Sequence, residues 1–298
     1  MPLKTRAVNP DNQLLAECRA QIDQIDGAMY ELLVQRAEII DNIKKLKTKK
    51  QLPIRPGREA QILRALAGRA KGKLPEGLVV RVWREIISAF SLQSGAVKVG
   101  VYEPVKGDGL WDMARDHYGA FTPLIVFPKV KAMIKALEEG KINVALVPAP
   151  DVDAQDAWWP LLAESKAKGL TVFQSLPFEK MKAGRSNARN ALPQGFMIGQ
   201  MYPELTGDDR SFLALECVHV PEAEMKRLLS KAGYKVRQLL MMSKGSADSA
   251  PTLYFAETDG FVGRSDTRLG RIKAMMGSRL KKLSPLGGYP VPLKNGKR

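Results

Sequence analysis

Four basic side chains stand in the first 60 residues at positions that also carry the apolar pattern of helices. They are Arg19, Arg36, Lys47 and Arg58, and Glu59 follows directly after the last of them. The first three sit beside residues that should face a core, where a cation usually meets an anion. Four cations beside one carboxyl group therefore suggest a small polyanionic substrate held inside a helical bundle.

The spacing of the first three of these cations places them on different faces of the predicted helix. Each residue of an α-helix turns by about 100°. Arg36 and Lys47 are eleven positions apart and share one face, whereas Arg19 lies about 100° round the helix from Arg36. One straight helix cannot easily aim Arg19 and Arg36 at the same small molecule. A dimer can do so if Arg19 reaches into the site of the partner subunit.

The pair Arg58 and Glu59 has two interpretations. Glu59 lies in the first turn of an expected helix, where a carboxylate complements the helix dipole. Alternatively, Arg58 is a fork for a substrate carboxylate and Glu59 accepts a hydrogen bond from a substrate hydroxyl. The spacing alone leaves both open.

The elements that must position these residues are helices. Apolar residues recur at helical spacing over residues 12–50, and Pro53 ends the run. Further helices are predicted over 58–69 and 78–93, and Pro56 suits the first turn of the former. A helix of nearly forty residues is too long to pack on itself in a small domain. It indicates a coiled-coil-like partner and hence a dimer.

The period changes after residue 97. Strands alternating with helices predict βαβ units and a mainly parallel sheet over 96–210. The remaining segment, 211–293, has the order β-α-β-β-α-β of a split βαβ, or ferredoxin-like, fold. The predicted strands are 97–101, 124–127, 143–148, 196–199, 212–220, 236–242, 252–257 and 283–289, and the predicted helices are 111–118, 130–139, 222–232 and 265–280.

Composition narrows the function classes. The 298 residues have a net charge of +16, and residues 221–298 carry 16 Lys or Arg against six Asp or Glu. The basic surface is either solvated or attracts anionic metabolites or nucleic acid, but no nucleic-acid motif accompanies it. No apolar run of 18 residues and no secretory signal occurs, so we expect no membrane span and a cytoplasmic location.

Few residues are available for metal or nucleophilic chemistry. Cys18 and Cys217 are far apart and read as reduced thiols, and the chain has two histidines, His117 and His219. We therefore expect no metal site, no cofactor and no Ser-His-Asp triad.

Residues 14–93 resemble the all-helical class of chorismate mutase found at the front of bifunctional P-proteins. The resemblance implies an intertwined homodimer of three-helix chains. It divides the chain into a mutase domain (11–95), a shortened, periplasmic-binding-like prephenate dehydratase region (96–210) and an ACT-like domain (211–293). The mutase motifs are LAECRAQIDQID at 15–26, LLVQR at 32–36, Lys47, PIRPGREAQIL at 53–63 and WREIISA at 83–89.

The resemblance implies conversion of chorismate, a dicarboxylate, to prephenate by an intramolecular rearrangement. Arg36 and Arg19 of the partner subunit would clamp carboxylates, with Arg58 nearby. Lys47 would donate to the breaking ether oxygen, and Glu59 would bind the ring hydroxyl. Positioning and stabilisation of the developing charge would supply the catalysis.

Two positions depart from the family pattern. Arg55 stands where the family usually has an acidic or small polar residue. The family's ether-oxygen donor near the end of the third helix is matched best by Gln93, which falls one residue early, and Ser94 takes the place itself.

The tail has family likenesses as well. Segments 99–104, 114–119, 196–199 and 206–211 resemble a prephenate dehydratase, but Gln194, Gly195 and Phe196 replace its catalytic Thr-Arg-Phe. The ending LGGYPV at 286–291 resembles that of P-protein regulatory domains, whose effector-binding signatures are missing here. The sequence thus predicts a chorismate mutase. The alternatives are a bifunctional mutase-dehydratase, a non-catalytic protein that senses chorismate or prephenate, and an RNA-binding protein with a steep salt dependence.

Overall fold

The computed structural model divides into two compact units, Met1–Gln51 and Leu52–Arg298. Within the part of the chain that the structure describes, no helix is long and apolar enough to cross a membrane. The structure describes residues 10–46, 52–70, 74–94, 97–104, 109–152, 156–164, 169–178, 194–243 and 251–293.

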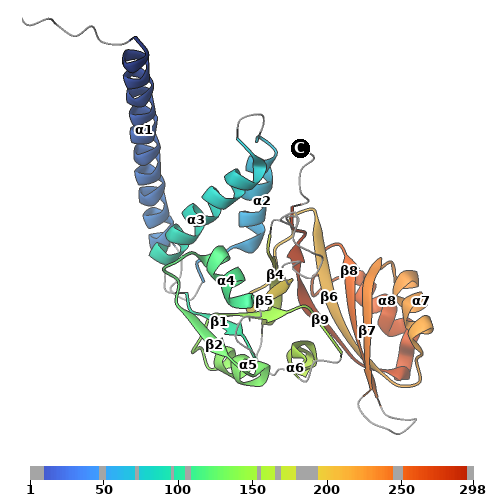
Figure 1. Ribbon diagram of the computed structural model, residues 1–298. Coiled ribbons are helices and arrows are strands. Elements are labelled where there is room, and N and C mark those ends of the chain that lie inside the picture. Colours follow the sequence, from blue (N-terminus) through green and yellow to red (C-terminus); the bar gives the residue numbers. More distant parts are fainter. Residues whose placement is uncertain are drawn as a thin grey trace, which may run out of the picture. The chain divides into compact units, whose positions relative to one another are not determined.

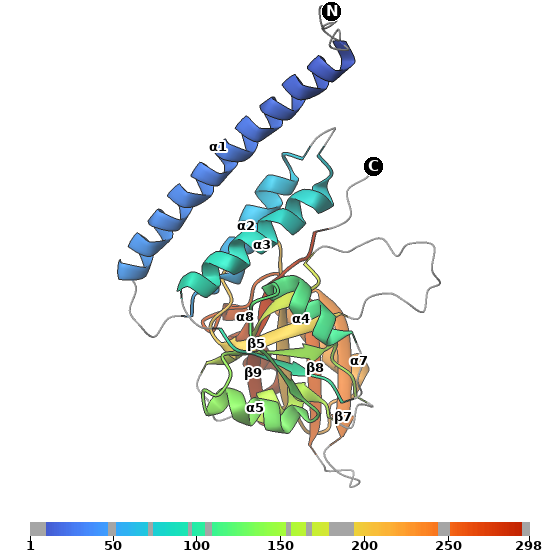
Figure 2. The ribbon, with the colours of Figure 1, turned by 60° about the vertical axis from the view of Figure 1, so that its left-hand side comes forward.

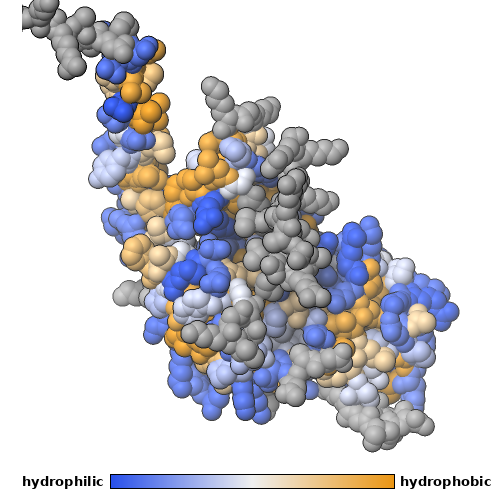
Figure 3. Space-filling view, viewed as in Figure 1, coloured by the Kyte–Doolittle hydropathy of each residue, from blue (hydrophilic) through white to orange (hydrophobic). Residues whose placement is uncertain are grey.

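The described part of the first unit is one helix, α1 (Pro10–Leu46), with Asp11 in its first turn and Lys44 and Lys45 in its last (Figure 1). The predicted long helix is confirmed over these residues, and residues 47–50 lie outside the described ones. Apolar side chains follow the helix along its exposed surface, as Figure 3 shows. The larger ones, with exposed fractions between 45% and 87%, are Leu14, Leu15, Ile22, Ile25, Met29, Tyr30, Leu32, Ile39, Ile43 and Leu46.

The second unit begins with a helix pair, α2 (Pro56–Ala67) and α3 (Glu76–Ser94). Pro56 occupies the first turn of α2, as predicted, where its missing N–H costs no hydrogen bond. The two helices pack through a small apolar cluster, which also includes Phe178 from a segment later in the chain. Its buried members are Ala60, Leu63, Ala67, Val80, Ile87 and Phe178.

In the part of the chain that the structure describes, nine strands form one sheet in the order β2-β1-β3-β5-β4-β9-β6-β8-β7. Strands β2, β1 and β3 are parallel, and β5 is antiparallel to both β3 and β4. This confirms the predicted βαβ units. The elements here are β1 (Val99–Tyr102), α4 (Leu110–Tyr118), β2 (Leu124–Phe127), α5 (Val130–Glu138), β3 (Val144–Pro148), α6 (Trp158–Glu164), β4 (Leu170–Leu176) and β5 (Gly195–Gln200).

Helices α4 and α5 cover opposite faces of this end of the sheet, as Figure 2 shows. Alternate residues of β3 divide between them: Val144 and Leu146 belong to the cluster that includes α4, and Ala145 and Val147 to the one that includes α5. This alternation follows from the period of two along a strand.

The other end of the sheet has the predicted β-α-β-β-α-β order, and its four strands are antiparallel in the order β9-β6-β8-β7. The ferredoxin-like prediction is therefore confirmed. The expected strand 212–220 begins earlier and ends at Cys217, and the last strand is longer than the expected 283–289. The elements are β6 (Asp209–Cys217), α7 (Glu222–Ala232), β7 (Val236–Ser243), β8 (Thr252–Asp259), α8 (Thr267–Met276), the 3₁₀ turn η2 (Gly277–Arg279) and β9 (Leu280–Pro290).

Strands β4 and β9 join the two ends of the sheet by parallel pairing at Val172 and Gly287. We call this junction of β4 and β9 the seam. Three aromatic residues of β5, β6 and β9 pack together near it: the ring centres of Phe196 and Phe212 are 5.0 Å apart, and those of Phe212 and Tyr289 are 5.5 Å apart. The segments 96–210 and 211–293 thus contribute strands to one sheet. Their division into separate domains stays a prediction.

Candidate functional site

The predicted mutase residues are divided between the two units. Helix α1 carries Arg19, which is exposed, and Arg36, which is half-buried, while Lys47 lies outside the described residues. Arg58 on α2 and Gln93 near the end of α3 are exposed. The side chain of Ser94 is not among the described ones, so the choice between Gln93 and Ser94 stays open.

Glu59 is buried on α2, where it forms an ion pair with a cation that the sequence pattern did not single out. Its Oε2 accepts a hydrogen bond from Nη1 of Arg84 at 3.1 Å, and the two side chains are 11% and 9% exposed. Its Oε1 accepts a hydrogen bond from the backbone N–H of Arg55 at 3.3 Å. Arg84 interrupts the apolar run of the third helix, and this was the signal that could have revealed it.

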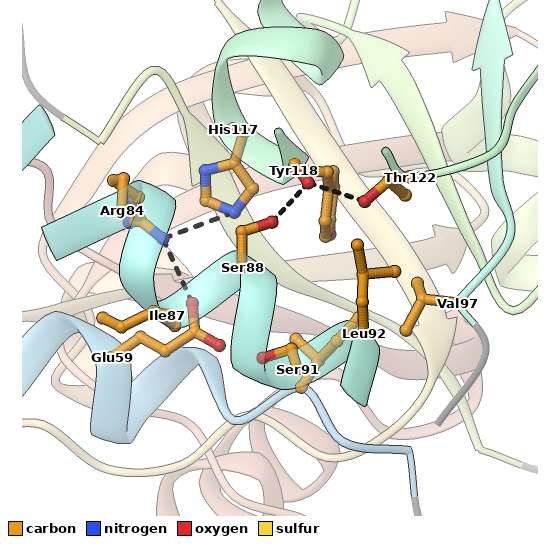
Figure 4. A pocket seen from close by; sticks show the side chains of 11 residues that line it. Glu59, Arg84, Ile87, Ser88, Ser91, Leu92, Val97, His117, Tyr118 and Thr122 are labelled. Atoms are coloured by element: carbon orange, nitrogen blue, oxygen red, sulfur yellow. Dashed lines mark hydrogen bonds and ion pairs between the residues drawn. The ribbon is translucent and has the colours of Figure 1, made fainter. Parts of the chain in front are cut away.

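Arg84 also connects the helix pair to α4 (Figure 4). Its Nη1 lies 3.4 Å from Nε2 of His117, and its guanidinium lies 5.2 Å from the ring centre of Phe178. A guanidinium can only donate, so Nε2 of His117 accepts, and the imidazole is neutral with its proton on Nδ1. Glu59, Arg84 and His117 therefore form one buried polar network.

The network borders a cavity of about 20 Å³. A cavity of this size holds about one water molecule, so it cannot admit an organic substrate. On its far side the hydroxyl of Ser88 donates to the backbone carbonyl of Tyr118, which also accepts from the hydroxyl of Thr122 at 2.6 Å (Figure 4). The cavity is therefore a small gap left where α3 packs against α4.

Burial and the neighbouring charge of Arg84 lower the pKa of His117 well below its ordinary value. The unfolded state therefore takes up a proton as the pH falls through about 6.5, while the folded state does not. We expect the free energy of unfolding to fall below this pH by up to about 1.4 kcal/mol per pH unit, and His117→Gln to remove that component. Denaturant titrations between pH 5 and 8 measure it.

The matched control is His219→Asn, because His219 is exposed and its φ of 54° is tolerated by asparagine. In this variant the free energy of unfolding should depend on pH as it does in the wild type. If the free energy of unfolding of His117→Gln still fell with pH as in the wild type, groups other than His117 would cause the loss of stability in acid.

Arg55 has a partner within the second unit. Its Nη2 lies 2.6 Å from Oε1 of Glu204, and the two side chains are 58% and 36% exposed. The other oxygen, Oε2, accepts a hydrogen bond from the backbone N–H of Arg58 at 3.3 Å. Glu204 thus anchors the start of α2 from a loop far along the chain.

Residues 18–93 match the family of type II chorismate mutases. The resemblance inferred from the motifs is thereby confirmed for this stretch, which we call the mutase segment. It contains every residue predicted for the substrate site. Among the described residues, no group of three or more His, Cys, Asp or Glu lies close enough together to hold a metal ion.

Curated relatives match between 30% and 46% of this chain. The bifunctional chorismate mutase/prephenate dehydratase of Pseudomonas aeruginosa is 27% identical over 144 residues, 46% of this chain and 39% of the relative. The enzyme of the same description from Aquifex aeolicus is 36% identical over 95 residues, 30% of this chain and 26% of the relative. The chain thus spans well under half the length of these relatives.

Among solved structures, prephenate dehydratase from Streptococcus mutans aligns with 65% of this chain and 97% of its own. The sequence identity is 14% and the TM-score is 0.45.

Proposed function

We propose that the protein is a chorismate mutase that converts chorismate to prephenate. The match of the mutase segment, residues 18–93, carries this proposal. That segment includes the cations Arg19, Arg36 and Arg58 with Lys47 and Glu59, whose types and spacing point to a polyanion independently of the family match.

The proposed mechanism needs no nucleophile. Arg36 and Arg19 of the partner subunit hold the two carboxylates, so that the substrate is kept in the folded conformer that rearranges. Lys47 donates a hydrogen bond to the ether oxygen, where negative charge grows as the bond breaks. Arg58 assists carboxylate binding, and Gln93 supplies a second donor to the ether oxygen. Glu59 accepts from the ring hydroxyl once the buried network around it opens, because the cavity of about 20 Å³ beside it holds only a water molecule. Arg84 holds the Glu59 carboxylate in one orientation through their 3.1 Å contact.

The exposed apolar surface of α1 supports a homodimer. Ile22, Ile25 and Leu32 are 56%, 59% and 63% exposed although they recur at helical spacing. A second copy of the helix could cover this surface, and burial of apolar area would stabilise the dimer by about 25 cal/mol per Å². The same arrangement would bring Arg19 to the partner's site.

The direct test follows the loss of chorismate by absorbance with the full-length protein. We expect turnover without added metal or cofactor. A folded, dimeric protein that leaves chorismate unchanged would contradict the proposal. If such a protein still bound chorismate, the sensing alternative would be favoured.

Mixing two inactive variants tests whether Arg19 acts across the dimer. Arg19→Ala and Arg36→Ala should each be nearly inactive as homodimers. After unfolding and refolding together, each heterodimer would have one site with both arginines, so about a quarter of all sites would recover. The same mixing with two batches of Arg36→Ala is the control. No recovery in the mixed sample, with heterodimers present, would place both arginines in one chain.

A bifunctional mutase-dehydratase is the second candidate. The alignment with the Pseudomonas relative covers 144 residues and so continues beyond the mutase segment. Against it, Gln194 stands within the replaced dehydratase motif, and its Nε2 donates to the hydroxyl of Ser175 at 3.0 Å. Formation of phenylpyruvate from prephenate would establish this second activity.

A further inference from the structure

A cavity of about 510 Å³ opens in the second unit where strands β4 and β9 separate. The two strands pair at Val172 and Gly287. Gly287 has a φ of 102° and lies beside an irregularity in the pairing of β9 with β6. The start of β4 and the middle of β9 therefore diverge, and both line the cavity together with the end of α6 and two loops.

Two cations stand in the wall of this cavity. The Nζ of Lys282 on β9 donates to the backbone carbonyl of Ala163 at 2.7 Å, which leaves two of its three N–H groups for another acceptor. The guanidinium of Arg264 lies 4.1 Å from the ring centre of Tyr202, a cation–π contact that restricts its orientation. No acidic residue is among the described residues that line the cavity, although Glu216 stands opposite Lys282 in the pairing of β6 with β9.

The rest of the described lining is mainly apolar. Leu162, Leu170, Val262 and Leu286 contribute aliphatic surface, and Phe261 adds a second aromatic ring. Sites for small organic ligands have volumes of about 300–1,000 Å³ and combine such walls with a few polar groups. The volume and the lining of this cavity agree with that pattern.

We propose that this cavity binds a small organic carboxylate with an apolar, ring-sized body. The carboxylate would lie between Lys282 and Arg264, where both donate charge-assisted hydrogen bonds. The body would rest against the aliphatic and aromatic side chains. Since the cavity lies at the seam between the two ends of the sheet, ligand binding would tie these ends together. The site is separate from the mutase segment, and the proposal does not depend on the mutase activity.

Binding of naphthalene-2-carboxylate to the full-length protein, measured by calorimetry, tests the proposal. Its neutral amide, naphthalene-2-carboxamide, is the matched probe without the charge. We expect saturable binding of the carboxylate with an affinity about tenfold or more above that of the amide, because two charge-assisted hydrogen bonds are lost. Lys282→Gln and Arg264→Gln should each weaken binding of the carboxylate by about tenfold and leave binding of the amide unchanged.

The control variants are Lys281→Gln and Arg271→Gln, which remove exposed cations that do not line the cavity. They should bind the carboxylate like the wild type. Equal affinity for carboxylate and amide, the same loss in all four variants, or no binding of the carboxylate by folded wild type would each overturn the proposal. Circular dichroism and thermal unfolding would verify that every variant is folded.

Discussion

Lys47→Ala should lower kcat for chorismate conversion by about 10²–10³, equivalent to about 2.7–4 kcal/mol of transition-state stabilisation. This is the typical loss when one donor to a developing oxyanion is removed. In the proposed mechanism Lys47 acts on the ether oxygen, whose charge grows only as the bond breaks. The change should therefore appear mainly in kcat rather than in KM. Initial rates of chorismate loss over a range of concentrations separate the two.

Lys45→Ala is the control, since it removes an exposed cation from the last turn of α1 and alters the net charge equally. It should retain the wild-type rate. If Lys47→Ala also retained it, Lys47 would have no part in the mechanism. If both variants lost activity together, the effect would belong to the overall charge of this segment.

Arg84→Ala should destabilise the second unit by about 3–5 kcal/mol, because it leaves the Glu59 carboxylate buried without its cation. The side chains of Arg84 and Glu59 are 9% and 11% exposed, so water cannot readily replace the lost partner. The substitution also removes the contact of the guanidinium with the ring of Phe178. Urea unfolding at pH 7 measures the change, provided that the m-value stays constant.

Two further variants separate the buried charge from general loss of packing. Arg55→Ala breaks an ion pair whose members are 58% and 36% exposed, and it should cost at most about 1 kcal/mol. Replacing both buried partners, Glu59→Leu with Arg84→Met, should recover much of the stability lost in Arg84→Ala. Equal losses in Arg84→Ala and Arg55→Ala would contradict a special role for the buried pair.

The regular elements were largely predictable from the sequence because their signals are local. The helix predicted over 222–232 is α7 (Glu222–Ala232) to the residue, with Pro221 before it and Gly233, in the left-handed region at a φ of 97°, after it. Strand β2 (Leu124–Phe127) is likewise as predicted. Such start and stop signals depend on backbone chemistry that each residue carries with it.

Strand β4 (Leu170–Leu176) and helix α6 (Trp158–Glu164) were not predicted. All seven residues of β4 are buried, but they include the polar Gln174 and Ser175. A polar residue inside a strand is stable when the fold supplies a partner, and Ser175 accepts a hydrogen bond from Gln194 across a long stretch of chain. Apolar periodicity cannot detect a strand in which a buried polar residue such as Ser175 finds its partner elsewhere in the chain.

By itself, the sequence determined the order of most helices and strands, the mutase motifs and the division of Arg19, Arg36 and Lys47 around the first predicted helix. These depend on the types and spacing of residues close together in the chain. Tertiary structure decided that Glu59 meets Arg84 and His117, that Arg55 meets Glu204, and that β4 and β9 join the sheet before they diverge around a cavity. Each of these pairs residues far apart in the sequence, and their proximity depends on packing and strand register that no local pattern specifies.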